Sequence, residues 1–163
     1  MKRFVVWYLA FIATVLFAGC NRGVELEGGM GVKPRVAFVM KSLNNPFFIQ
    51  MEEGAKEEAE KLGVELIVQA AQREVDVERQ MQIIENLIQT QVDALCVTPS
   101  GSKEILPAIQ KANEANIPVL IVDSGINEEA AETMNVQTAT FIGSDNYEGG
   151  RIAGEYMIQQ FSE

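Results

Sequence analysis

The sequence predicts an α/β fold built on a parallel, doubly wound sheet. Five short apolar runs alternate with longer polar or amphipathic segments along the chain. An alternation of strands and helices implies parallel strands joined by right-handed crossovers. The runs are apolar almost throughout, as expected of strands that helices cover on both faces. The length of 163 residues is enough for one domain.

The first strand and the first helix carry clear signals at both ends. Residues 35–40 form an apolar run, and an amphipathic stretch follows at 46–62. We expect Asn45 or Asn44 to cap this helix, Pro46 to occupy its first turn and Gly63 to end it. Its predicted inward face has apolar residues three or four positions apart, namely Phe48, Met51, Ala55, Ala59 and Leu62.

Two further strand–helix units are predicted next. Residues 64–68 and 94–97 read as strands. Asp76 is expected to cap a helix that runs to residue 90, and Ser102 a helix that runs to residue 116. The spacing of apolar residues predicts inward positions at Val77, Met81, Ile84 and Ile88 in the first helix and at Ile105, Ala108, Ile109 and Ala112 in the second.

The last third of the chain predicts two more strands and a final helix. The strands lie at 117–122 and 139–143, and the segment 126–135 between them is interpreted as a polar connection. A helix over 147–161 then follows, with Ile152, Ala153, Tyr156 and Met157 directed inward.

Polar and aromatic residues follow the strands at the points where ligands bind in open α/β sheets, the carboxyl ends of the strands. These stretches are 42–48, 69–72, 98–102 and 123–127, and they supply amides, hydroxyls, a carboxylate and aromatic rings. Amides donate and accept hydrogen bonds, and a carboxylate is a strong acceptor for adjacent hydroxyls. A Phe face covers the apolar side of a ligand. The set suits a neutral polyol.

Four stretches resemble the ribose-type periplasmic sugar-binding proteins, the solute receptors of ABC importers. In chain order they are Asn44-Asn45-Pro46-Phe47-Phe48, 93–99, 112–119 and 142–146. The resemblance runs from about residue 34 to the end. It implies the type I periplasmic binding protein fold, no enzymatic activity and binding of a monosaccharide by hinge closure, with delivery to an ABC permease.

The resemblance also implies a set of ligand-binding residues. Asp123 matches the aspartate that grips the sugar, Asn45 and Phe47 match the first binding loop with Phe48 beside them, and Thr98 matches a further contact position. Structural roles stay open for three of them. Asn45 could serve only as a helix cap, Asp123 only as a cap of the next turn, and Phe48 as part of the core.

The sequence departs from the ribose-specific members directly after Asp123. An arginine follows the aspartate there, whereas this chain has Ser124. The change removes a planar bidentate donor. Another pentose or hexose, or a sugar-like signal molecule, is therefore as compatible as ribose. Asp145 is interpreted as a turn or hinge residue rather than a ligand contact.

Members of the family have two similar lobes and about twice this length. The resemblance predicts an N-terminal lobe at 34–143, and a hinge with the first helix of a second lobe at 144–163. The second lobe is expected to be largely absent, so the chain is either a fragment or a short product that binds sugar weakly. Good small-molecule sites bury most of the ligand.

The first residues predict export and lipid anchoring. Lys2 and Arg3 precede an apolar segment over 4–17, which is shorter than the roughly 20 residues of a spanning helix. The residues before Cys20 resemble a bacterial lipobox. This implies a signal peptide at 1–19, a lipid on Cys20 and an extracytoplasmic protein held to the membrane. A plain signal peptide or an uncleaved anchor is the alternative. The glycine-rich segment 20–33 reads as a flexible tether.

Composition excludes several functions. A net charge of −10 argues against nucleic acid as a partner. The chain has no histidine, and neither a phosphate loop nor Gly-x-Gly-x-x-Gly is present. We therefore expect no catalytic residues, cofactor or metal. Cys96 is expected to be a small buried apolar residue without a disulfide to Cys20. The alternative to an importer component is a membrane-side sensor for a kinase or chemoreceptor.

Overall fold

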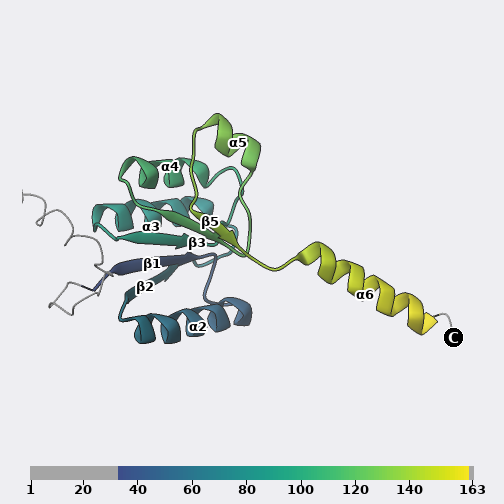
Figure 1. The fold of residues 1–163 in the computed structure, drawn as a ribbon. Helices are drawn as coiled ribbons and strands as arrows, with labels where there is room; N and C mark the ends of the chain where they lie inside the picture. The colour runs from purple at the N-terminus through teal and green to yellow at the C-terminus, as the bar shows by residue number, and fades with distance from the viewer. Residues whose placement is uncertain (1–32, 162–163) are drawn as a thin grey trace, which may run out of the picture. The chain divides into compact units, whose positions relative to one another are not determined.

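The computed structural model describes residues 33–161. They contain a five-stranded parallel sheet in the order β2-β1-β3-β4-β5, so the predicted fold class is confirmed (Figure 1). In chain order the elements are β1 (Arg35–Met40), α2 (Pro46–Leu62), β2 (Glu65–Ala70), α3 (Val77–Gln89), β3 (Ala94–Val97), α4 (Leu106–Glu114), β4 (Val119–Val122), α5 (Glu128–Thr133), β5 (Thr140–Ile142) and α6 (Asn146–Phe161).

The order of the strands makes the sheet doubly wound. The chain moves from β1 outward to β2, then returns past β1 to β3 and continues to β4 and β5. Since all crossovers keep the same hand, helices before and after this reversal lie on opposite faces. Figure 1 shows α2 below the sheet and α3 and α4 above it. The strand order reverses between β1 and β3, which is the usual position of a ligand site.

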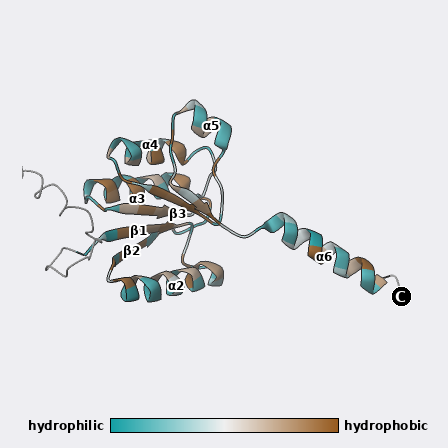
Figure 2. Cartoon of the chain, viewed as in Figure 1, coloured by the Kyte–Doolittle hydropathy of each residue, from teal (hydrophilic) through white to brown (hydrophobic). Residues whose placement is uncertain are grey.

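Two apolar layers hold the sheet between its helices. The larger one joins β1, β3 and β4 to α3 and α4, and its members include Val39, Ile84, Leu95 and Ile109. The smaller one contains Phe38 and Met40 of β1 with Phe48 of α2. In Figure 2 the strands are brown, while the helices carry teal on the sides away from the sheet. Burial of these side chains supplies the main driving force for the fold.

Helix α2 agrees with the predicted bounds and with most of its predicted face. Phe48 and Ala59 are buried, and Met51 and Ala55 pack against the smaller core layer. Leu62 is a correction, because it is 68% exposed at the last turn. The helix ends at Gly63, whose φ of 69° is a left-handed conformation that favours glycine.

Helix α3 has the predicted cap but a different buried face. The Asp76 carboxylate accepts a hydrogen bond from the backbone N–H of Arg79 at 3.2 Å. The buried residues are Gln80, Ile83, Ile84 and Leu87, whereas Val77, Met81 and Ile88 are only partly buried. The predicted face was therefore rotated. The buried face includes the polar residue Gln80, so a search for apolar residues alone does not identify that face.

Several boundaries differ from the predictions because pairing, not composition, sets them. β2 extends to Ala70 since its register with β1 continues to Met40. β4 begins only at Val119, the first residue paired with β3.

Helix α4 begins at Leu106, and no side chain caps it. Ser102 is thus not a helix cap. The four predicted inward residues are nevertheless all buried: Ile105 directly before α4, and Ala108, Ile109 and Ala112 within it.

The segment 126–135 holds a helix that was predicted as a connection. Helix α5 begins after Asn127, whose side-chain oxygen accepts a hydrogen bond from the backbone N–H of Ala130 at 2.8 Å. Glu128 and Glu129 occupy its first turn, where negative charge is favourable. A helix of this length has too few apolar positions to show a period.

The predicted inward residues of α6 are not inward among the described residues. The helix buries none of its side chains, and Ile152, Tyr156 and Met157 are each more than half exposed. Ion pairs within the helix add a small stabilisation, since Arg151 binds Glu148 at 2.6 Å and also contacts Glu155. The bond from Arg151 lowers the pKa of Glu148. Asp145 caps the first turn by accepting from the backbone N–H of Glu148 at 2.9 Å.

Within residues 33–161, no helix is long and apolar enough to cross a membrane. The same residues contain no group of three or more side chains placed to hold a metal ion. The predicted signal peptide, Cys20 and most of the tether lie outside the described residues.

Cys96 is a free thiol in β3 that packs against the smaller core layer, but it is only partly buried and not fully buried as predicted. Burial raises the pKa of this thiol. Because the thiolate is the reactive form, we expect Cys96 in a C20S variant to resist an aromatic disulfide reagent at pH 8 and to react fully after unfolding. Absorbance of the released thiol measures this. Reaction in the folded protein as fast as after unfolding would show that packing against the smaller core layer does not protect Cys96.

Candidate functional site

The carboxyl ends of β1, β3 and β4 meet at one edge of the sheet, around the reversal between β1 and β3. The backbone N–H of Thr98 donates to Val39 at 2.9 Å, which ties the end of β3 to β1. Polar residues follow each of these strands: Lys41 and Ser42 after β1, Thr98 after β3, and Asp123 after β4. The predicted site residues are therefore distributed along a single edge.

The turn between β1 and α2 is held by two asparagines. Asn45 caps α2 through its side-chain oxygen, which accepts from the backbone N–H of Phe47 at 3.0 Å. Its amide nitrogen donates to Glu74 at 3.0 Å, and the Asn44 amide donates to the carbonyl of Gln72 at 3.0 Å. The segment after β2 therefore fixes the turn after β1. Both polar atoms of Asn45 have partners inside the protein.

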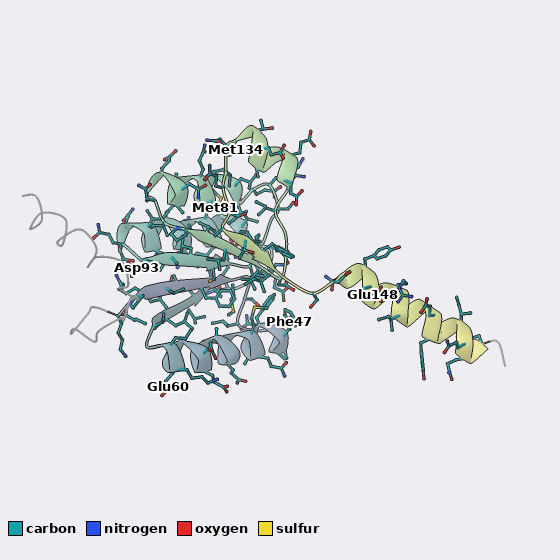
Figure 3. The ribbon with its side chains drawn as sticks, in the orientation of Figure 1. Phe47, Glu60, Met81, Asp93, Met134 and Glu148 are labelled. Carbon is teal, nitrogen blue, oxygen red and sulfur yellow. The ribbon has the colours of Figure 1, made fainter. Side chains whose placement is uncertain are left out.

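The two phenylalanines of this turn have different environments. Phe48 is 3% exposed and belongs to the core beside Met40. Phe47 is 52% exposed at the first turn of α2 (Figure 3). The rings meet edge to face, with centroids 5.2 Å apart and an angle of 77° between their planes. The buried ring of Phe48 thus packs against the ring of Phe47. Phe47 is the phenylalanine whose ring is accessible to a ligand.

Buried hydroxyl groups lie beneath the edge. Thr98 is fully buried, and its hydroxyl has no hydrogen-bond partner among the described residues. The hydroxyl of Ser100 is in the same situation. Ser42 is 2% exposed, and its oxygen accepts a 3.4 Å contact from the backbone N–H of Asn44. Buried hydroxyls usually have partners, so the unpaired Thr98 group is a notable feature of this edge.

Asp123 is held in an unusual conformation at the end of β4. Its φ is 65°, in the left-handed region that few residues other than glycine, asparagine and aspartate adopt. The backbone N–H of Asp123 donates to Ile142 of β5 at 2.8 Å, which fixes the position. Because aspartate tolerates this region, the conformation sets the direction of the Asp123 side chain at little energetic cost.

The Asp123 carboxylate takes part in a chain of hydrogen bonds that joins two turns. The hydroxyl of Ser124 donates to Oδ2 of Asp123 at 3.0 Å, and Nζ of Lys41 donates to the oxygen of Ser124 at 2.6 Å. The chain runs from the turn after β1 to the turn after β4. Lys41 was not predicted as a site residue, because nothing in its sequence neighbourhood indicates a partner 83 positions away.

Gln80 is a second residue that the sequence interpretation missed. Its side chain is fully buried, and its amide nitrogen donates to the carbonyls of Met40 at 3.3 Å and Thr98 at 2.9 Å. Its amide oxygen accepts from the backbone N–H of Ser100 at 2.8 Å. One side chain from α3 therefore joins the ends of β1 and β3. The sequence indicated its burial only by spacing, because Gln80 lies three and four positions before the apolar residues Ile83 and Ile84.

A separate pocket of about 380 Å³ lies between β4, α5 and β5. No predicted site residue lines it; its wall consists of Ile121, Gly125, Ile126, Glu128, Ala131, Glu132, Val136, Thr138 and Phe141. The polar part of its wall consists of Glu128, Glu132 and Thr138, without the amide side chains found at the strand edge. The strand edge has the appropriate chemistry, so we place the candidate site there.

Known proteins are similar to this chain in sequence and in fold. Residues 36–163 match the family described as "Periplasmic binding protein domain". The D-ribose/D-allose-binding protein of Pseudomonas aeruginosa is 38% identical over 91% of this chain and 48% of its own length. The ribose import binding protein of Bacillus subtilis is 32% identical over 88% of this chain and 42% of its own length.

Solved structures give the same result. A solute-binding protein of Actinobacillus succinogenes with bound D-allose is 40% identical, with a TM-score of 0.70 over 74% of this chain and 42% of that one. A solute-binding protein of Burkholderia multivorans with an unknown ligand is 36% identical, with a TM-score of 0.75 over 80% of this chain and 46% of that one. The chain spans about half the length of the curated relatives it matches.

The family match covers the sheet and its helices. The relatives are of the same type as the proteins that the sequence motifs resemble. The family consists of binding proteins and not of enzymes, in agreement with the prediction. The chain therefore belongs to the periplasmic binding protein family, and its similarity to members named for ribose or allose extends over about half of their length.

Proposed function

We propose that this chain binds a monosaccharide at the edge formed by the ends of β1, β3 and β4. The observation that carries the proposal is the Asp123 carboxylate, held at a φ of 65° at this edge in a member of a sugar-binding family. A carboxylate held in one place can accept hydrogen bonds from two adjacent hydroxyls of a sugar. Several relatives are named for ribose or allose, which fits a neutral polyol as ligand.

The other residues have complementary roles in this proposal. Phe47 covers the apolar face of the sugar ring, with Phe48 as its support. Thr98 offers a buried hydroxyl that lacks a partner among the described residues. Asn45 contributes its amide only if it exchanges Glu74 for the sugar, because its oxygen already caps α2. Otherwise Asn45 orders the loop that carries Phe47.

We further propose that the site is one half of a clamp. The segment 144–163 serves as the hinge and first helix of a second lobe, and the residues at 34–143 form the first lobe. Closure of two lobes excludes water from the ligand, and the closed form then docks to an ABC permease. The residues at 1–19 act as the export signal, with 20–33 as the tether. A lipid on Cys20 then holds the protein at the extracytoplasmic face of the membrane.

Calorimetric titration of the full-length chain in detergent tests the binding proposal. The titrants are D-ribose, D-allose, D-arabinose, D-fucose and myo-inositol, with maltose as a ligand too large for the site. We expect saturable binding of at least one monosaccharide, and recovery of that sugar chemically unchanged. Absence of binding across the panel, or conversion of the sugar, would reject the proposal.

Thr98 provides a prediction with opposite effects on stability and binding. T98V replaces a buried hydroxyl that lacks a partner among the described residues, so the free energy of unfolding should change by no more than about 1 kcal/mol, in the stabilising direction. Affinity for the sugar should fall about tenfold if the hydroxyl donates to the ligand. Urea unfolding and calorimetry measure the two quantities. Unchanged affinity would assign Thr98 to the core alone.

A further inference from the structure

We infer that Lys41 is a positioning residue for the ligand-binding carboxylate and acts on Asp123 through Ser124. The geometry is a continuous chain, with Nζ of Lys41 2.6 Å from Oγ of Ser124 and that oxygen 3.0 Å from Oδ2 of Asp123. Lys41 and Ser124 are both partly buried. This inference rests on the proposed sugar-binding function and adds a residue that neither the sequence motifs nor the relatives' names assign.

The chemistry of the three groups fixes the direction of the chain. An ammonium group only donates, so the Ser124 oxygen must accept from Lys41. The single hydroxyl proton of Ser124 then remains for Asp123, and it points to Oδ2. A hydroxyl between a cation and an anion is polarised by both, which strengthens each bond. Without Lys41, the Ser124 hydroxyl could rotate away from the carboxylate.

The consequence for the site is an oriented carboxylate. The backbone of Asp123 is fixed by its left-handed φ and by its bond to Ile142, and the chain from Lys41 fixes the side chain as well. The bond to Ser124 engages Oδ2, which leaves Oδ1 to accept hydroxyl groups from a ligand. Pre-orientation lowers the entropy lost on binding. Since β1 and β4 are separated by β3, the chain also links the turns of two strands that are not neighbours.

A set of variants of the full-length chain separates this role from general packing. K41M keeps the length of the side chain without its charge, and S124A removes the connecting hydroxyl. Each should weaken binding of the sugar identified in the titration panel about tenfold. The K41M/S124A double variant should bind as weakly as either single variant, within about twofold, because the chain is already broken. K41R should restore most of the affinity. K61M, which removes an exposed lysine from α2, is the matched control.

The outcomes distinguish the relay, meaning the chain of hydrogen bonds from Lys41 through Ser124 to Asp123, from the proposed function. Multiplied losses in the double variant, or parent affinity in S124A, would overturn the relay while leaving sugar binding intact. If the parent binds no monosaccharide, the proposed function fails, and urea unfolding of the parent, K41M, S124A and the double variant still tests the relay. Unfolding midpoints of K41M and S124A that do not add in the double variant support the chain of hydrogen bonds. Midpoints that add in full overturn it.

Discussion

Replacement of Asp123 by alanine is expected to abolish monosaccharide binding. The variant loses the charged acceptor of the site, and hydrogen bonds to a charged group contribute about 1.5–3 kcal/mol each. Two such bonds correspond to a loss of about a hundredfold or more in affinity. Alanine at a φ of 65° adds strain of about 1–2 kcal/mol to the fold. Calorimetric titration measures the affinity, and urea unfolding measures the strain.

Asparagine at the same position separates charge from backbone strain. Asparagine tolerates the left-handed region as well as aspartate does, so D123N should unfold close to the parent. Its affinity should still fall at least tenfold, because a neutral oxygen accepts more weakly than a carboxylate. D93N is the matched control: the Asp93 carboxylate accepts from the backbone N–H of Arg35 at 2.7 Å, at the opposite edge of the sheet from Phe47 (Figure 3). Parent affinity in D123N and D123A would remove Asp123 from the site.

The fold was predictable from the sequence because each strand is marked on its own. An apolar run such as 94–97 needs no distant information, and its neighbours in the chain supply the turns. The helix faces were less predictable. In α3 the buried position of Gln80 depends on carbonyl groups of β1 and β3 that come together only in the folded sheet. The short helix α5 begins at the cap formed by Asn127. One asparagine in a polar segment does not distinguish a helix start from an ordinary loop.

The site was predictable only as a list of strand ends. Topology brings Thr98 and Asp123 to the same edge as Phe47, and the sequence motifs indicated all three. The contact between Lys41 and Ser124 depends on the order of strands in the sheet, which local patterns do not contain. For α6 the local pattern predicted burial that the described residues do not show. Their spacing is typical of a packed helix, yet no element among the described residues covers them.

Replacement of Gln80 by leucine is expected to cause the largest loss of stability among single substitutions at this edge. Leucine matches the size of the side chain but leaves the carbonyls of Met40 and Thr98 and the backbone N–H of Ser100 without their buried partner. Each unsatisfied group costs about 1–3 kcal/mol. Because the chain can relax in part, we expect a total loss of about 3 kcal/mol in the free energy of unfolding. Urea unfolding followed by circular dichroism measures it.

Q89L is the matched control, since Gln89 lies exposed at the end of the same helix. Its free energy of unfolding should stay within about 0.5 kcal/mol of the parent. Gln80 also fixes the separation of the turns after β1 and β3, so the Q80L protein that remains folded should bind sugar more weakly than the parent. A loss below about 1 kcal/mol would show that these backbone groups find other partners. Full affinity in a destabilised Q80L protein would confine the role of Gln80 to the fold, because the two turns would then keep their arrangement without it.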